Sequence, residues 1–355
     1  MLAIVTTNKL KMTKNNSPIV LKGTTTYYEK LVPEIAERLS TDQLVFLHDV
    51  LMGGCQYNCL KCFSSSSKAY EEQLRERNVT VENLGSTLRR KLVKEAYSLG
   101  VRSIVIAGAG EPLMSKDLDT IIDTSSELGI NPIVFTNGLL LDEKKAREYL
   151  SKGVSIIFSF DSINPDYYDI LTGTRNNFKI AFENLKSALE IAESYSNVEN
   201  GYKVVQLAVN TNPTILTYDS AEEIDEIGEI HELIQGKAAH FVSHPTPSGN
   251  AIKHWKLLGG TEELSFNPDI INAQRKYSAG LGGSSRRKDE RCAYIHNGVV
   301  HFAGHWMVCP NQGAKEDFGR YPDVSVQEHF EQKKKFLMGI NNPPCITRMN
   351  WKDTK

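Results

Sequence analysis

The sequence predicts an α/β fold: a partial (βα)6 TIM-like barrel followed by a small C-terminal α+β domain. Between residues 44 and 250, short runs of β-branched and apolar residues alternate with longer amphipathic runs. This alternation favours a parallel sheet built from right-handed βα units. The six predicted strands are fewer than the eight of a closed barrel, so we expect the barrel to be incomplete. After Gly249 the alternation stops and a mixed segment follows.

Each unit is justified by its own pattern. The strand candidates are Leu44–Val50, Ser103–Ala107, Pro132–Thr136, Ser155–Asp161, Lys203–Asn210 and Ala238–Ser243. The helix candidates span residues 83–99, 116–128, 142–152, 177–196 and 218–235. In the first of these helices, leucines 84, 88, 92 and 99 recur at helical spacing.

The segments that flank the barrel are shorter. Residues 1–43 form an N-terminal lead segment with one amphipathic stretch at Tyr28–Leu39. Residues 44–250 form the barrel, and residues 251–355 form the C-terminal domain. In that domain we expect two strands, Tyr294–Phe302 and Trp306–Val308, that turn near Ala303 and Gly304. A helix is expected over Val326–Leu337.

Composition excludes several classes of protein. Of the 355 residues, 40% are hydrophobic and 24% are charged, which is typical of a globular protein. No stretch approaches the roughly 20 apolar residues that span a bilayer, so a cytoplasmic protein without membrane contact is expected. The formal net charge of −2 does not predict a broad basic surface that would bind nucleic acid. The basic runs Arg286–Lys288 and Lys333–Lys335 are interpreted as solvated loop and helix charges.

The six cysteines are clustered. Cys55, Cys59 and Cys62 lie within eight residues, and the other three are in the last quarter of the chain. In a cytosolic protein such clusters indicate metal ligands rather than disulfides. Three thiolates on one loop can hold three corners of an iron–sulfur cubane and leave one iron open. The alternative is a structural zinc site with His48 as fourth ligand, but His48 falls inside a predicted strand.

Chemically versatile residues follow the predicted strands. The cysteine loop follows the first strand, Gly110 and Glu111 follow the second, Asn137 follows the third, and Asp161 ends the fourth. Because the carboxyl ends of parallel strands meet at one edge of a barrel, these residues are expected to form one site.

The spacing Cys55-x3-Cys59-x2-Cys62 is the signature of the radical S-adenosylmethionine (radical SAM) superfamily, which the chain resembles over residues 44–250. The resemblance implies that the three cysteines bind a 4Fe–4S cluster and that S-adenosylmethionine chelates its fourth iron. It also implies reductive cleavage to a 5′-deoxyadenosyl radical, which abstracts a hydrogen from the substrate. A reductant such as flavodoxin or ferredoxin would supply the electron.

The same resemblance assigns the cofactor-binding residues. Ala109-Gly110-Glu111-Pro112 is similar to the Gly-Gly-Glu motif that contacts the methionine amino group. The remaining contacts that it implies are Asn137 and, near the ribose, Ser159 and Asp161. The family usually has an aromatic residue before the third cysteine, where this chain has Lys61. We therefore expect Phe63 to pack near adenine instead.

The C-terminal cysteines resemble the SPASM and Twitch extensions of radical SAM enzymes. This resemblance implies that Cys292, Cys309 and Cys345 hold a second, auxiliary 4Fe–4S cluster, which we expect near the barrel mouth. Three readings of the site stay open. The fourth iron is open to substrate, or an unusual ligand fills the place, or the cysteines are merely buried. The candidates for an unusual ligand are His301, His305 and Arg348.

The favoured hypothesis is a radical SAM enzyme that oxidises or rearranges a small biosynthetic intermediate. If both clusters form, no cysteine remains as a hydrogen donor, which favours oxidation. A radical SAM maturase of a peptide or protein is the alternative, although the 43 residues before the first strand are short for a leader-recognition domain. An alternative of another class is a non-enzymatic iron–sulfur or zinc-binding protein.

Overall fold

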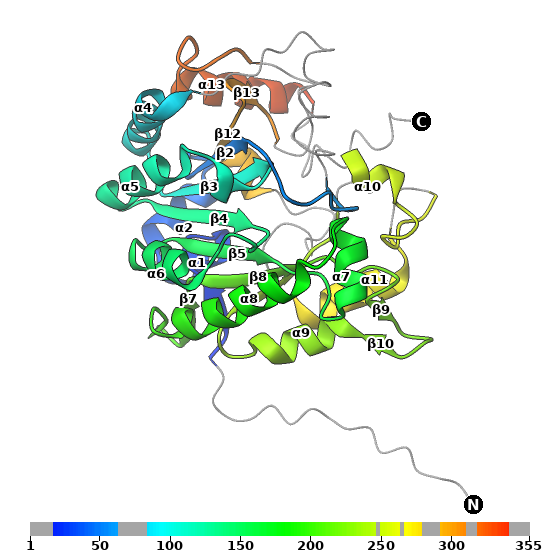
Figure 1. Ribbon diagram of the computed structural model, residues 1–355. Helices are drawn as coiled ribbons and strands as arrows, with labels where there is room; N and C mark the ends of the chain where they lie inside the picture. The colour runs from blue at the N-terminus through cyan, green and yellow to red at the C-terminus, as the bar shows by residue number, and fades with distance from the viewer. Residues whose placement is uncertain are drawn as a thin grey trace, which may run out of the picture.

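The computed structural model describes residues 17–62, 84–245, 249–262, 266–278, 292–309 and 318–340 (Figure 1). Its strands are β1 (Ile19–Leu21), β2 (Phe46–Met52), β3 (Ser103–Ala109), β4 (Asn131–Thr136), β5 (Ser155–Ser159), β6 (Asn197–Glu199), β7 (Tyr202–Val205), β8 (Leu207–Thr211), β9 (Tyr218–Asp219), β10 (Ile224–Asp225), β11 (Ala239–Val242), β12 (Gly298–Phe302) and β13 (His305–Met307). Its helices are α1 (Thr25–Leu31), α2 (Pro33–Ser40), α4 (Gly85–Ser98), η1 (Pro112–Met114), α5 (Leu118–Leu128), α6 (Glu143–Ser151), α7 (Pro165–Thr172), α8 (Phe178–Glu193), α9 (Glu226–Ile234), α10 (Gly249–Lys253), α11 (Pro268–Tyr277), α12 (Ala293–His296) and α13 (Val326–Gly339).

The main sheet has eight strands in the order β11-β8-β5-β4-β3-β2-β12-β13. Every neighbouring pair is parallel except β12 and β13. The helices α4, α5, α6, α8 and α9 alternate with the barrel strands along the chain, and several lie along one side of the sheet in Figure 1. A large apolar core fills the space between these helices and the outward faces of the strands. The six predicted strands are all present in the sheet.

Three elements differ from the sequence-based expectation. The predicted helix 218–235 begins only at Glu226, because residues 218–225 form the β9–β10 hairpin. The predicted strand 203–210 is interrupted at Gln206, whose Nε2 donates to the Leu150 and Val154 carbonyls. The N-terminal amphipathic stretch forms two helices, since Pro33 cannot continue the first and instead begins the second.

The C-terminal hairpin is part of the barrel sheet. Strand β12 pairs in parallel with β2 from Gly298–Phe46 to Phe302–Val50, and β13 returns antiparallel to it. The turn at Ala303 and Gly304 is where the sequence predicts it, and both residues have positive φ. The first strand of the hairpin starts later than predicted, because residues 293–296 form the short helix α12. The sheet therefore continues across the boundary predicted at residue 250.

A buried charge network connects this hairpin to the barrel. Asp49 on β2 contacts the Arg89 guanidinium of α4 through both carboxylate oxygens, and its Oδ1 lies 2.9 Å from His301 Nδ1 on β12. Arg89 Nε also donates to Asp117 at 3.2 Å, at the start of α5. All four residues are at most 3% exposed. Burial opposes the ionisation of Asp49, but Arg89 and His301 outweigh it and lower its pKa to about 2.

None of the helices in the described ranges combines the length and the apolar character that crossing a membrane requires.

Candidate active site

The cysteine loop directly follows β2 and is fixed by backbone contacts from distant segments. The Asn58 and Leu60 N–H groups donate to the Thr172 and Leu171 carbonyls at the end of α7, each at 2.9 Å. The next residue, Gly173, has φ +63°, and a Cβ there would lie 2.4 Å from the Asn58 carbonyl oxygen. Only glycine therefore allows α7 to support the loop this closely.

Asn250 closes the other side of the loop. Its N–H donates to the Cys62 carbonyl at 2.9 Å, and its Nδ2 donates to Asn58 Oδ1 at 2.9 Å and to the Cys59 carbonyl at 3.3 Å. The sequence analysis assigned no role to Asn250. The structure shows that it connects the first and last parts of the barrel domain through the cysteine loop.

Two N–H groups point at the Cys55 sulfur. The Tyr57 backbone N–H donates to Sγ at 3.5 Å, and Asn137 Nδ2 lies 3.7 Å from it. Burial raises the pKa of the neighbouring Cys59 thiol, which Lys61 opposes. N–H donors around sulfur tune and stabilise thiolate ligands of iron–sulfur clusters, so the donor set fits such a group. In the described part of the chain, no three His, Cys, Asp or Glu side chains converge as the ligands of a single ion would.

Glu111 organises the end of β3. It is 3% exposed, and its carboxylate accepts hydrogen bonds from the Leu113 N–H (3.1 Å), the Thr136 hydroxyl (2.8 Å) and the Asn137 N–H (2.8 Å). Burial raises the pKa of Glu111, while these donors lower it. The carboxylate therefore joins the ends of β3 and β4 and aims Asn137 at the cysteine loop. A carboxylate can accept about four hydrogen bonds, so one acceptor position remains for a ligand ammonium.

Gly110 lets this turn approach the cysteine loop. A Cβ on Gly110 would lie 2.3 Å from the Gly53 carbonyl oxygen, and the Glu111 N–H donates to the Gly54 carbonyl at 2.9 Å. The two segments are thus in direct backbone contact.

Replacement of Gly110 by alanine is expected to destabilise the protein by about 1–3 kcal/mol and to lower iron incorporation, because a new methyl group must displace the backbone of the cysteine loop. Gly53→Ala is the matched control, since a Cβ on Gly53 meets no atom within 4 Å. Urea denaturation and iron content of the two variants check this. Equal behaviour of the two variants would contradict it.

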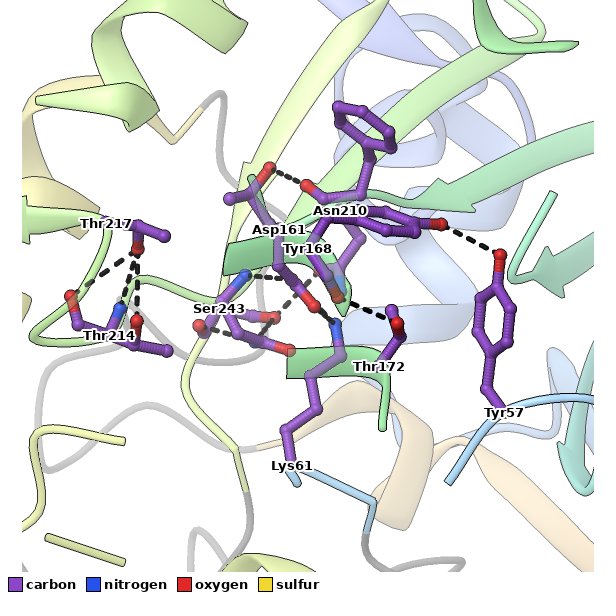
Figure 2. Close-up of polar contacts among 12 residues, drawn as sticks. Tyr57, Lys61, Asp161, Tyr168, Thr172, Asn210, Thr214, Thr217 and Ser243 are labelled. Atoms are coloured by element: carbon purple, nitrogen blue, oxygen red, sulfur yellow. Dashed lines mark hydrogen bonds and ion pairs between the residues drawn. The ribbon is translucent and has the colours of Figure 1, made fainter. Parts of the chain in front are cut away.

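Asp161 and Lys61 form a second connection to the loop (Figure 2). Lys61 Nζ lies 2.7 Å from the Asp161 carboxylate, which also accepts the Asn212 N–H at 2.8 Å. Both side chains are mostly buried. The pair therefore ties the residue before Cys62 to the ends of β5 and β8. The sequence marked Lys61 only as a departure from the family pattern, and its partner was not predicted.

Figure 2 also shows the phenol pair Tyr57–Tyr168, whose hydroxyl oxygens are 2.9 Å apart. Tyr57 lies between Cys55 and Cys59, and Tyr168 is on α7. This pair packs the cysteine loop onto the apolar core. Ser159, at the end of β5, is next to Asn210 on β8 in the sheet register. Phe63, the predicted adenine contact, lies outside the described residues, as do Cys345 and Arg348.

The two described cysteines of the second set, Cys292 and Cys309, are not near the barrel mouth, contrary to the expectation from sequence. Cys292 precedes β12, and Cys309 follows β13, so both lie by the amino end of β2, whereas the cysteine loop follows its carboxyl end. The seven residues of β2 separate these edges by roughly 20 Å, at about 3.3 Å per residue. The error arose because the direction of the hairpin relative to the barrel is a tertiary feature.

The two described cysteines of this set lie close together. Cys292 and Cys309 belong to one apolar cluster with Ile295, Val308 and Leu337. His301 Nδ1 is bonded to Asp49, and His305 lies beside the turn, at the other end of β13 from Cys309.

Comparison with known proteins places this arrangement in a family. The Radical SAM superfamily model matches residues 50–197, from the middle of β2 through the cysteine loop to β6. The matched segment, which contains the cysteine loop, is similar to the radical SAM superfamily. Members of this superfamily are enzymes.

One curated relative is a probable GTP 3′,8-cyclase from Methanococcus maripaludis strain C5. It is 30% identical over 178 residues, which are 50% of this chain and 54% of that protein. The chain therefore spans about half the length of this relative.

Two solved structures have a similar fold. The structure of native anSMEcpe with bound AdoMet has a TM-score of 0.55 and 17% identity, covering 84% of each chain. The structure of Streptococcus suis SuiB bound to precursor peptide SuiA has a TM-score of 0.54 and 15% identity, covering 84% of this chain and 68% of SuiB. These likenesses confirm the α/β partial barrel.

Proposed function

We propose that this radical SAM protein transforms a small biosynthetic intermediate, by oxidation or rearrangement, with Cys55, Cys59 and Cys62 as the ligands of a 4Fe–4S cluster. The observation that carries the proposal is the meeting of four segments at one barrel edge: the cysteine loop, Gly110-Glu111, Asn137 and Asp161. When bound there, the cluster would supply the electron that cleaves S-adenosylmethionine to a 5′-deoxyadenosyl radical. A flavodoxin or ferredoxin is the proposed electron donor.

Each residue at this edge has a proposed task. Glu111 accepts the methionine ammonium with its remaining acceptor position. Asn137 contacts the Cys55 sulfur with its side chain and donates to Glu111 with its backbone N–H. It would therefore fix the position of the cluster relative to S-adenosylmethionine. Asp161 is held by Lys61 and Asn212 and faces the ribose together with Ser159. These contacts would orient the reacting atoms before the chemistry begins.

An auxiliary 4Fe–4S cluster held by Cys292, Cys309 and Cys345 is the second part of the proposal. Its support is the convergence of Cys292 and Cys309 on one apolar cluster, beside a buried cation, Lys333. A small substrate would then lie within the barrel, between the two edges. Because His301 is bonded to Asp49 and His305 lies at the other end of β13 from Cys309, we favour an open iron or a ligand from outside the described residues.

A small-molecule substrate is favoured over a peptide. The relatives found by sequence include proteins named as GTP cyclases, whereas the SuiB structure, bound to a precursor peptide, is similar in fold at only 15% identity.

The test is anaerobic reconstitution followed by counting of iron and sulfide. We expect about eight irons per chain in the wild type and about four in the Cys55/Cys59/Cys62→Ala variant, since each four-iron cluster is held by one cysteine set. About four irons that fall to none would contradict the auxiliary cluster but not the catalytic one. Cleavage of S-adenosylmethionine by the triple variant would contradict the catalytic assignment itself.

A further inference from the structure

Lys333 is buried where a helix should be apolar. It lies on α13, whose buried residues are Val326, His329, Phe330, Lys333 and Leu337, and it is 0% exposed. Figure 1 shows α13 beside the β12–β13 hairpin. The Lys333 ammonium contacts the Gly298 carbonyl oxygen at the start of β12. The sequence-based interpretation of Lys333 as a solvated helix charge is therefore wrong, and its spacing from Val326 and Phe330 was the available signal.

This cation has no carboxylate partner among the described residues. Its electrostatic neighbours are Cys292 and Cys309, which favour the charged form, and Lys334, which opposes it. The charge of Lys333 also lowers the pKa of two buried imidazoles, His48 and His329. Neither imidazole can carry the negative charge that would neutralise the ammonium. Lysine is almost never fully buried unless it is paired, because removing an ammonium from water costs several kcal/mol.

The two cysteines are the only described groups near Lys333 that can become anionic. Cys292 lies before α12 and Cys309 after β13, so two separate segments contribute cysteines to the apolar cluster that includes Leu337 of α13. Protonated thiols carry no charge and would leave the ammonium uncompensated. Thiolates bound to an iron–sulfur cluster, together with its sulfides, form an anionic group that would compensate it.

We propose that Lys333 is the fixed counter-charge of the auxiliary cluster bound by Cys292 and Cys309, and that its ammonium stabilises the reduced form of that cluster. The inference rests on the auxiliary cluster of the proposed function. Reduction adds one electron to the cluster, and a positive charge held at short range in an apolar site favours the more negative state. Lys333 is thus a positioning and tuning residue, which touches no substrate.

The experiment uses the full-length Cys55/Cys59/Cys62→Ala variant, reconstituted anaerobically, so that the auxiliary cluster is the cluster observed. Lys333→Met keeps the length of the side chain, and Lys333→Gln keeps a donor for the Gly298 carbonyl. The experiment can be carried out if at least one of these two variants folds. Lys335→Met is the matched control, because it removes the same charge from an exposed position of the same helix. Iron content and circular dichroism establish loading and folding, and an EPR-monitored potentiometric titration gives the redox state.

We expect the Lys333 variants to show at least a tenfold lower ratio of reduced to oxidised cluster at a fixed potential, which is a shift of about 59 mV for a one-electron couple. The Lys335 variant should stay within threefold of the parent. A loaded Lys333 variant with the parent's redox ratio would overturn the role of Lys333 and leave the auxiliary cluster standing. Absence of iron from the parent triple variant would instead overturn the auxiliary cluster, and the inference with it.

Discussion

Replacement of Cys59 by alanine is expected to abolish the formation of 5′-deoxyadenosine under reducing, anaerobic conditions. Cys59 is the central ligand of the proposed catalytic cluster, and its loop is fixed by α7 and Asn250, so no other described cysteine can take its place. Chromatographic detection of 5′-deoxyadenosine, with iron content measured on the same sample, checks this. We expect product at background level and the loss of about four irons, the content of one cubane.

Tyr57→Phe is the control for damage to the loop. Tyr57 lies two residues from Cys59, and the change removes its hydroxyl bond to Tyr168 while keeping the ring in the core. Loss of one neutral hydrogen bond costs about 1 kcal/mol, so this variant should bind its cluster and form product. Unimpaired product formation by Cys59→Ala would remove the basis for the assignment.

Replacement of Arg89 by methionine is expected to lower the free energy of unfolding by about 3–5 kcal/mol, because it leaves Asp49 and Asp117 buried without their cation. The same change removes the charge that holds α4 and α5 against β2, next to the cysteine loop. Urea denaturation of the metal-free protein measures the loss. Arg90→Met is the matched control: Arg90 is half exposed, and its ion pair with Glu127 at 3.9 Å contributes little, so a change within about 0.5 kcal/mol is expected.

The difference between wild type and Arg89→Met should depend on pH. The pKa of Asp49 is about 2 in the folded protein, below its ordinary value near 4, so its contribution to stability is complete above about pH 4. That contribution is lost as the pH falls toward 2. In the variant, burial without Arg89 raises the pKa of Asp49, so protonation already relieves the unpaired charge at a higher pH. The two stabilities should therefore converge as the pH falls, and a constant difference would show that Arg89 acts by packing alone.

The barrel strands could be predicted because their runs of β-branched and apolar residues are continuous and buried on both faces. The region around residues 218–225 was predicted wrongly as helix. Its two strands are too short to show the alternating hydrophobic pattern that would distinguish them from the first turns of α9. Lys333 was predicted wrongly for a related reason. A charge run indicates solvent, and only the packing of α13 against β12 shows that one of its members is buried.

By itself, the sequence determined the spacing of Cys55, Cys59 and Cys62, on which the proposed catalytic cluster depends, because this spacing is local and does not change with the arrangement of the remaining chain. It also determined the order of the βα units and thus the edge at which Glu111, Asn137 and Asp161 lie. Only the tertiary structure decided that Lys61 pairs with Asp161, and that Cys292 and Cys309 lie at the opposite edge beside Lys333. These facts depend on contacts between residues far apart in the chain, and the pairing direction of β12 with β2 is set by burial and hydrogen bonding rather than by local pattern.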